Sequence, residues 1–384
     1  MKNVFSALLF CSTTFALAQV TVFRNEHVDV SASFAVGTPP SVAVRDDASA
    51  ALIPGPQGMM VLGSNAKKVR TSTDGFGFIG VNPGENYWRI PQGQVAQILF
   101  LGLAAYGVSS GSIDSYDPTT ESAGRVTGVG PWVRFQLHQV TGPGLVSTWQ
   151  AAVGGPKVFF NSTDGLSASD SVWLLAGGHS HFNWAFTHTG CYDVQIRSNV
   201  FLNDGNGATL GAFTPGDVYS IHFGIEVDPA PVAGELTLQS FEGDLSTRTM
   251  RLQIRKSGNI VDERSQPIMT TTGWVPNRGR FAMTTAERGN LEVILKPRTG
   301  LSKVIPVAAF DQNGLLNQNL SFVNGDINGD DSVDLLDYFD LSDAYNTAAG
   351  DPSFLDVADL NGDLSVDLLD YFILSDSYNL TGQA

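Results

Sequence analysis

An internal repeat near the C-terminus is the feature that most constrains this chain. The segment DINGDDSVDLLDYFDLSDAYN begins at residue 326 and DLNGDLSVDLLDYFILSDSYN begins at residue 359, so the period is 33 residues. A period of this length indicates two copies of one small structural unit. Each copy opens with acidic and amide residues and continues into an apolar-periodic stretch, which predicts a loop followed by a helix. We expect the apolar faces of the two helices to pack on each other.

The loops place oxygen ligands at positions 1, 3, 5, 9 and 12, with a backbone carbonyl at position 7. Ca²⁺ takes roughly six to eight hard oxygens, and a 12-residue loop with this spacing wraps around one ion. The carboxylates of an empty loop repel one another, so we expect two Ca²⁺ ions and folding only with metal. The alternative is an acidic, disordered tail. The predicted ligands are Asp326, Asn328, Asp330, Ser332, Asp334 and Asp337, and then Asp359, Asn361, Asp363, Ser365, Asp367 and Asp370.

Loop position 6 departs from the usual pattern of such sites. A glycine normally stands there because the chain turns with φ > 0. Here the residues are Asp331 and Leu364. Asp tolerates a left-handed conformation better than Leu does, so we expect the second site to be weaker or slightly reshaped.

A duplicated calcium loop followed by one helix resembles the type I dockerin module, and the resemblance covers residues 324–380. It implies docking onto a cohesin through the first turn of each helix, here around Leu335-Leu336 and Leu368-Leu369. Both pairs are apolar, whereas well-known cohesin binders have Ser, Thr or basic residues at these positions. A cohesin-like or cell-surface partner, packing of the tail on the rest of the chain, and generic surface attachment all stay open.

Charge and composition bound the rest of the chain. The net charge is −16, and residues 324–384 contain fourteen Asp and no Lys or Arg. Nothing is basic enough to predict nucleic-acid binding. Residues 1–18 read as a secretory signal peptide, and no later apolar run is long enough to span a membrane. We therefore expect a secreted protein that is extracellular or bound to the cell surface.

The fold class that we expect is mainly β, because Gly, Val, Thr and Phe are frequent and turn signals recur at short intervals. A proline-bearing break near residue 230 and the composition shift at residue 324 divide the mature chain. The expected parts are a large β-sandwich over 19–230 (the first module) and a smaller β-sandwich over 231–323 (the second module). The third is a small α-helical dockerin-like domain over 324–384 (the C-terminal unit) with paired EF-hand-type calcium loops.

Histidines in the first module suggest a second metal. In a strand through residues 179–186, alternation puts His179, His181 and Asn183 on one face, and we expect this strand to form half of a hairpin closed by the turn at 187–190. His27 and Asp29 share a strand face in the same way. Two histidines at i and i+2 can converge on a transition metal such as Zn²⁺, completed by a neighbouring strand. The alternative is an ordinary polar strand face.

Cys191, the one cysteine after the signal peptide, is predicted to be a packed residue.

Three motifs in order along the first module resemble the choice-of-anchor M, or surface-anchored repeat, family. They are His27-Val28-Asp29, Trp88-Arg89-Ile90-Pro91-Gln92, and the stretch from His179 to Phe186 followed by Gly190-Cys191-Tyr192. The resemblance implies a secreted protein with a C-terminal anchor and no assigned enzymatic activity, and some members resemble components associated with metal uptake.

We expect a non-catalytic ligand-binding or display protein with an attachment tail. The alternative is an extracellular polysaccharide hydrolase of the glycoside hydrolase class, with carbohydrate as the ligand. Such an enzyme needs two carboxylates about 5–9.5 Å apart across a sugar site, and the acidic residues of the first module form no recognisable pair. Ser109 matches the letters of a Gly-x-Ser-x-Gly elbow, but no helical pattern follows it.

Overall fold

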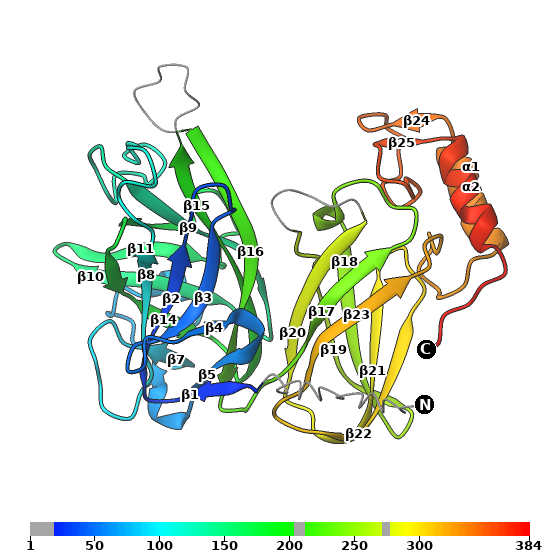
Figure 1. The fold of residues 1–384 in the computed structure, drawn as a ribbon. Coiled ribbons are helices and arrows are strands. Elements are labelled where there is room, and N and C mark those ends of the chain that lie inside the picture. The colour runs from blue at the N-terminus through cyan, green and yellow to red at the C-terminus, as the bar shows by residue number, and fades with distance from the viewer. Residues whose placement is uncertain (1–18, 203–211, 271–276) are drawn as a thin grey trace, which may run out of the picture.

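The computed structural model describes residues 19–202, 212–270 and 277–384, so the proposed signal peptide lies outside the described residues. The structure is mainly β, as expected, with two α-helices at the C-terminal end. Figure 1 shows the second module between the first module and these helices. Within the described residues no helix is long and apolar enough to cross a membrane.

The first module adds a third sheet to the expected pair, and all three sheets enclose one core. That core runs from Phe23 to Ile225 in sequence. The six-stranded sheet has the order β1 (Thr21–Phe23), β5 (Gly58–Leu62), β16 (Ala212–Ile225), β15 (Gly190–Leu202), β9 (Trp132–Thr141) and β12 (Ser171–Leu175). One five-stranded sheet has the order β11 (Gly155–Asn161), β10 (Val146–Ala152), β14 (Asn183–Phe186), β7 (Asn86–Ile90) and β6 (Lys67–Val69). The other, which we call the histidine sheet, has the order β13 (His179–His181), β8 (Phe100–Gly107), β2 (His27–Ser33), β3 (Ser41–Asp46) and β4 (Leu52–Pro54).

The expected single strand through residues 179–186 is wrong. The chain crosses between sheets at Phe182, which is 2 % exposed and packs in the core. As a result β13 pairs with β8, whereas β14 pairs with β10 and β7. The segment after the turn, β15, pairs with β16 and β9 and forms no hairpin with β14. Asn183 therefore lies apart from the two histidines, and its amide donates to the Trp149 carbonyl.

The second module has two sheets around a core from Ala230 to Phe322. One sheet is β20 (Arg278–Thr285), β17 (Ala230–Leu238) and β23 (Leu315–Phe322), and the other is β19 (Asn259–Pro267), β18 (Thr249–Lys256), β21 (Gly289–Pro297) and β22 (Lys303–Phe310). Among the residues that the structure describes, four short 3₁₀ turns connect strands. The first module contains η1 (Gly55–Gln57), η2 (Ser64–Ala66) and η3 (Gly77–Ile79), and the second contains η4 (Leu245–Thr247).

A buried polar contact joins the two β modules. His222 and Asp193 of the first module are both fully buried, and His222 Nδ1 lies 2.7 Å from Asp193 Oδ1. The backbone N–H and the hydroxyl of Thr284, in the second module, both donate to the Asp193 carboxylate. Because a buried carboxylate needs such partners, this contact fixes how the modules meet.

The C-terminal unit contains α1 (Leu335–Ala344), α2 (Leu368–Ser377) and a two-stranded ribbon, β24 (Thr347–Ala348) with β25 (Ser365–Val366). The expectation that the apolar helix faces pack on each other is met in part, because Leu341 and Leu374 share one core. Tyr338 and Tyr371 do meet, with ring centroids 6.3 Å apart. Leu336 and Phe339, however, are 55 % and 52 % exposed.

The buried face of each helix is set by the loop that precedes it. At about 100° per residue, residues four apart share a face, so the buried Leu341 lies beneath the buried Asp337. Asp337 has to turn towards its loop, and Leu336 and Phe339 consequently point to solvent. α2 repeats this arrangement with Asp370 and Leu374 inside.

Candidate metal sites

Backbone N–H groups hold the first three ligand side chains of the first calcium loop. Asp326 Oδ1 accepts a hydrogen bond from Gly329 N at 2.8 Å. Asn328 Oδ1 accepts one from Asp330 N at 2.8 Å, and Asp330 Oδ1 accepts one from Ser332 N at 2.9 Å. These bonds fold the loop back on itself.

Asp337 at position 12 closes this loop. Its Oδ1 accepts hydrogen bonds from Ile327 N and Asn328 N, and its Oδ2 accepts one from Asp334 N. Asp334 caps α1 in turn by accepting from Leu336 N, which completes a capping box. One carboxylate thus ties the start of the loop to the start of the helix.

The second loop repeats these bonds residue for residue. Asp359 accepts from Gly362 N and Leu364 N, and Asp370 accepts from Leu360 N, Asn361 N and Asp367 N. Burial raises the pKa of Asp326, Asp359 and Asp370. Each loop therefore concentrates carboxyl groups that gain from a nearby cation.

Loop position 6 is left-handed in both copies, with φ of 74° at Asp331 and 72° at Leu364. The expected reshaping of the second loop is therefore absent from its backbone. For Leu this conformation costs about 1–2 kcal/mol, and Leu364 stays exposed. Asp331 gains compensating bonds, because its carboxylate accepts from the backbone N–H and the hydroxyl of Ser302 in the second module.

The second module presents a buried basic side chain to each loop. Lys296 donates to the Asp326 carboxylate and to the Gly300 carbonyl, and its Nζ lies 3.4 Å from Asp331 Oδ1. Arg248 reaches the second loop through the Asp356 and Asp359 carbonyls. Leu301 of the second module also joins the core of the C-terminal unit. The loop side of this unit is thus packed against the second module.

The donor set of both loops fits Ca²⁺. Every predicted ligand offers oxygen, from Asp, Asn or the backbone, and Ca²⁺ prefers such hard donors. Ten of the twelve predicted residues precede the helices, and Asp337 and Asp370 lie in the first turns of α1 and α2. Position 7 falls at Ser332 and Ser365, just before Asp334 and Asp367 cap the helices.

The histidine sheet gathers a second ligand set, which we call the histidine cluster: His27, Asp29 and His181. β8 runs between β2 and β13, so Asp29 and His181 both lie beside Gly102. A Cβ atom at Gly102 would lie 2.1 Å from Asp29 Oδ1 and 3.0 Å from His181 Cε1. The missing side chain leaves the space in which Asp29 and His181 approach each other.

The ligand atoms of the histidine cluster all lie within 4.8 Å of one another. His27 Nε2 and His181 Nε2 are 3.2 Å apart. His27 Nδ1 lies 3.0 Å from Asp47 Oδ2, and this contact favours the tautomer with a free Nε2 lone pair. Within the described part of the chain, no other three His, Cys, Asp or Glu side chains are gathered this tightly.

Of the three residues in this cluster, Asp29 gives the strongest evidence for a bound cation. It is fully buried, and neither carboxylate oxygen has a hydrogen-bond partner. Burial raises the pKa of Asp29 and lowers the pKa of His181 to about 4. A buried, unpaired carboxylate is costly, and a bound cation would satisfy it. This burial argues against an ordinary solvent-facing polar strand.

His179 is the one predicted ligand outside the cluster. It is exposed on β13, with its ring centroid 5.5 Å from that of His181 and 5.3 Å from that of Tyr106. Three residues that the sequence interpretation missed support the cluster. Phe100 stacks on His181 with centroids 3.7 Å apart, Asp47 contacts His27, and Gly102 opens the space. A glycine inside the apolar run of residues 98–106 was the available signal, since such a glycine marks a close approach.

Cys191 is buried, and burial raises the pKa of its thiol to about 12, which disfavours a nucleophilic thiolate.

No family model and no curated protein sequence matches this chain. Among solved structures, it is similar to an N-terminal interface mutant of a type II cohesin–X–dockerin complex from Acetivibrio cellulolyticus, at 16% identity over 40% of this chain and 97% of that chain, with a TM-score of 0.30. A C-terminal interface mutant of the same complex gives 15% identity, the same coverage and a TM-score of 0.29. A leucine-rich repeat protein from Bacteroides thetaiotaomicron covers 50% of this chain at 13% identity, with a TM-score of 0.19. Likenesses this low have no bearing on function.

Proposed function

We propose that this chain is a secreted, calcium-dependent attachment protein. Its C-terminal unit binds two Ca²⁺ ions and docks onto a cohesin-like or other cell-surface protein, and its β modules are displayed without catalysis. One observation carries the proposal: both helices expose matching apolar residues at the same repeat positions. These residues, which we call the helix face, are Leu335, Leu336, Phe339, Leu368, Leu369 and Phe372, each between 51 % and 55 % exposed.

The helix face suits protein docking because contiguous exposed apolar residues mark interaction surfaces. It is available to a partner because the opposite, loop side of the unit packs on the second module through Lys296, Arg248 and Leu301. Ca²⁺ would act on this surface indirectly, since Asp337 and Asp370 link each loop to the first turn of its helix.

Hydrogen exchange of the full chain tests the calcium part of the proposal. With Ca²⁺, the amides of residues 335–344 and 368–377 should exchange slowly, and with a chelator they should exchange quickly. The amides of β15 and β18 should exchange equally in both conditions and serve as the internal control. Equal protection of the helices with and without Ca²⁺ would contradict the proposal.

Substitutions on the helix face test docking. Leu336→Asp combined with Leu369→Asp should abolish binding to purified cohesin modules and to isolated cell envelopes while two Ca²⁺ ions stay bound. Val153→Asp is the matched control, because Val153 is an exposed apolar residue of the first module. Binding that survives the double substitution would exclude the helix face.

We further propose that the histidine cluster binds a transition metal such as Zn²⁺. The unpaired Asp29 carboxylate beside two facing imidazoles supports this site, since His and Asp are common Zn²⁺ ligands. Metal analysis of the purified full chain should find one such ion, lost in His181→Ala and retained in the matched control His138→Ala. A wild-type protein that holds no transition ion after dialysis against Zn²⁺ would overturn this proposal. The hydrolase alternative is tested separately, by hydrolysis of a glycan panel.

A further inference from the structure

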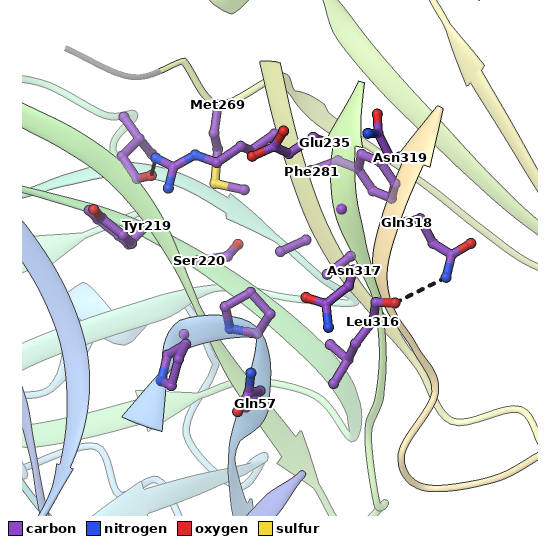
Figure 2. A pocket seen from close by; sticks show the side chains of 18 of the residues that line it. Gln57, Tyr219, Ser220, Glu235, Met269, Phe281, Leu316, Asn317, Gln318 and Asn319 are labelled. Atoms are coloured by element: carbon purple, nitrogen blue, oxygen red, sulfur yellow. Dashed lines mark hydrogen bonds between the residues drawn. The ribbon is translucent and has the colours of Figure 1, made fainter. Parts of the chain in front are cut away.

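A cavity of about 510 Å³ lies where the first and second modules meet. The first module contributes η1 and part of β16, and the second contributes β17, β20 and β23 (Figure 2). Its volume falls in the range of small-molecule sites, roughly 300–1,000 Å³, and such sites often lie between domains. Its lining includes no residue of the histidine cluster and none of the calcium loops.

Side chains with unused hydrogen-bonding groups line this cavity. Ser220 is 2 % exposed, and its hydroxyl has no partner. The side-chain amides of Gln57 and Asn317 make no hydrogen bond within the described residues, and Figure 2 shows both near Ser220, one from each module. A buried hydroxyl without a partner is costly, so a ligand that hydrogen-bonds with Ser220 would stabilise this arrangement.

The backbone places Asn317 at the cavity. β17 and β23 pair with a register shift between Val232 and Gly234, so that two residues of β23 stand opposite one of β17. Asn317 sits in this bulge with φ of 57°. Bulges re-aim side chains and are frequent near binding sites.

Arg280 and Glu235, the charged side chains that line the cavity, each already form an ion pair. Arg280 donates to Asp217 and to the Val218 carbonyl, and Glu235 pairs with Arg278. Apart from the buried Arg280 Nε, which has no hydrogen-bond partner among the described residues, the groups left for a ligand are neutral donors and acceptors. Beside them lie apolar surfaces, including those of Leu316 and Pro56.

We propose that this cavity binds a neutral, hydroxyl-rich ligand of the size of a mono- or disaccharide. Sugar hydroxyls would hydrogen-bond with Ser220, Gln57 and Asn317, and the C–H faces of the sugar ring would lie against the apolar wall. A charged sugar would have to compete with the existing ion pairs. The ligand would also bridge the two modules.

The test is saturation-transfer NMR and calorimetry on the full chain with neutral mono- and disaccharides, each paired with an acidic or amino-sugar analogue. We expect saturable binding of at least one neutral sugar and weaker binding of its charged analogue. A panel without any saturable neutral sugar, or a charged analogue that binds more tightly, would overturn the proposal.

Two variants locate the site. Ser220→Ala and Asn317→Gly each remove one hydrogen-bonding group, and Gly keeps the left-handed backbone at 317, so each should weaken sugar binding about 3- to 10-fold. Gln94→Ala, on an exposed loop of the first module, is the control and should bind as the wild type does. Thermal melting confirms that each variant is folded. Unchanged binding in both cavity variants would place the sugar elsewhere and reject this site.

Discussion

The calcium loops and the histidine cluster both hold buried carboxylates, but they position and stabilise these groups in different ways. Each loop draws its ligands from twelve consecutive residues, and backbone N–H groups already bond to its carboxylates. The histidine cluster draws its ligands from β2 and β13, with β8 between them, and leaves the Asp29 carboxylate without a partner. The loops are thus shaped by their own backbone, whereas the cluster depends on the whole sheet. A single substitution should therefore disable one region and spare the other.

The largest effect that we expect comes from Asp370→Ala. This change removes a calcium ligand and leaves the amides of Leu360, Asn361 and Asp367 without an acceptor, at about 1–3 kcal/mol each. Bound Ca²⁺ should fall from two ions to one, and exchange of residues 368–377 should become fast. Asp376→Ala, at an exposed position of the same helix, is the control. Loss of the transition metal in Asp370→Ala would show that the calcium loops and the histidine cluster are not independent.

Gly102→Ala should weaken Zn²⁺ binding at the histidine cluster and leave Ca²⁺ binding at the loops unchanged. The added methyl group would overlap Asp29 Oδ1 and displace a ligand, so we expect Zn²⁺ affinity to fall by more than the roughly 10- to 100-fold that loss of an outer-shell partner costs. Calorimetry should show unchanged binding of two Ca²⁺ ions. At Gly93 a Cβ would meet nothing within 4 Å, which makes Gly93→Ala the matched control. Equal Zn²⁺ affinity of the two variants would remove Gly102 from the site.

Asp47→Asn should weaken Zn²⁺ binding less. Asp47 holds the His27 ring through Nδ1, and loss of such a partner typically costs about 10- to 100-fold in metal affinity. Asp46→Asn changes the neighbouring carboxylate, which bonds to Ala48 and Ser49 instead, and should bind Zn²⁺ as the wild type does. If both variants lose affinity equally, general charge rather than orientation of His27 explains the effect.

The smallest effect distinguishes the two loops. The Lys296 ammonium contacts the Asp326 carboxylate directly, whereas Arg248 reaches the second loop through the backbone carbonyls of Asp356 and Asp359. Because a cation repels Ca²⁺, Lys296→Met should tighten Ca²⁺ binding at the first loop by about three- to tenfold. Arg248→Met should change binding at the second loop less, as measured by calorimetry of the full chain. A weaker first loop in Lys296→Met would show that Lys296 orients Asp326 more than it repels the ion.

Sequence spacing was sufficient to predict the two loop–helix units because their geometry is local. Ligand offsets and helix caps lie within one segment, so the repeat predicted both loops and both helices. It could not predict which helix face is buried, because the orientation of Asp337 and the contact with the second module decide that. In the first module, alternation placed His27 and Asp29 on one face of their strand. It could not show the crossing at Phe182, the fit of Asp29 and His181 at Gly102, or the separation of His179, since these depend on how distant strands align.

The connection between the second module and the C-terminal unit is short and partly buried. β23 ends at Phe322, and the first loop begins at Asp326 after a connection in which Asn324 is 1 % exposed and bonded to Thr299 and to the Leu360 carbonyl. A partner bound to the helices would therefore hold the β modules in a fixed orientation, because no flexible linker separates them from the C-terminal unit. If the proposed attachment holds, the β modules would sample a smaller volume than on a flexible linker, and their effective concentration toward a ligand in that volume would be higher.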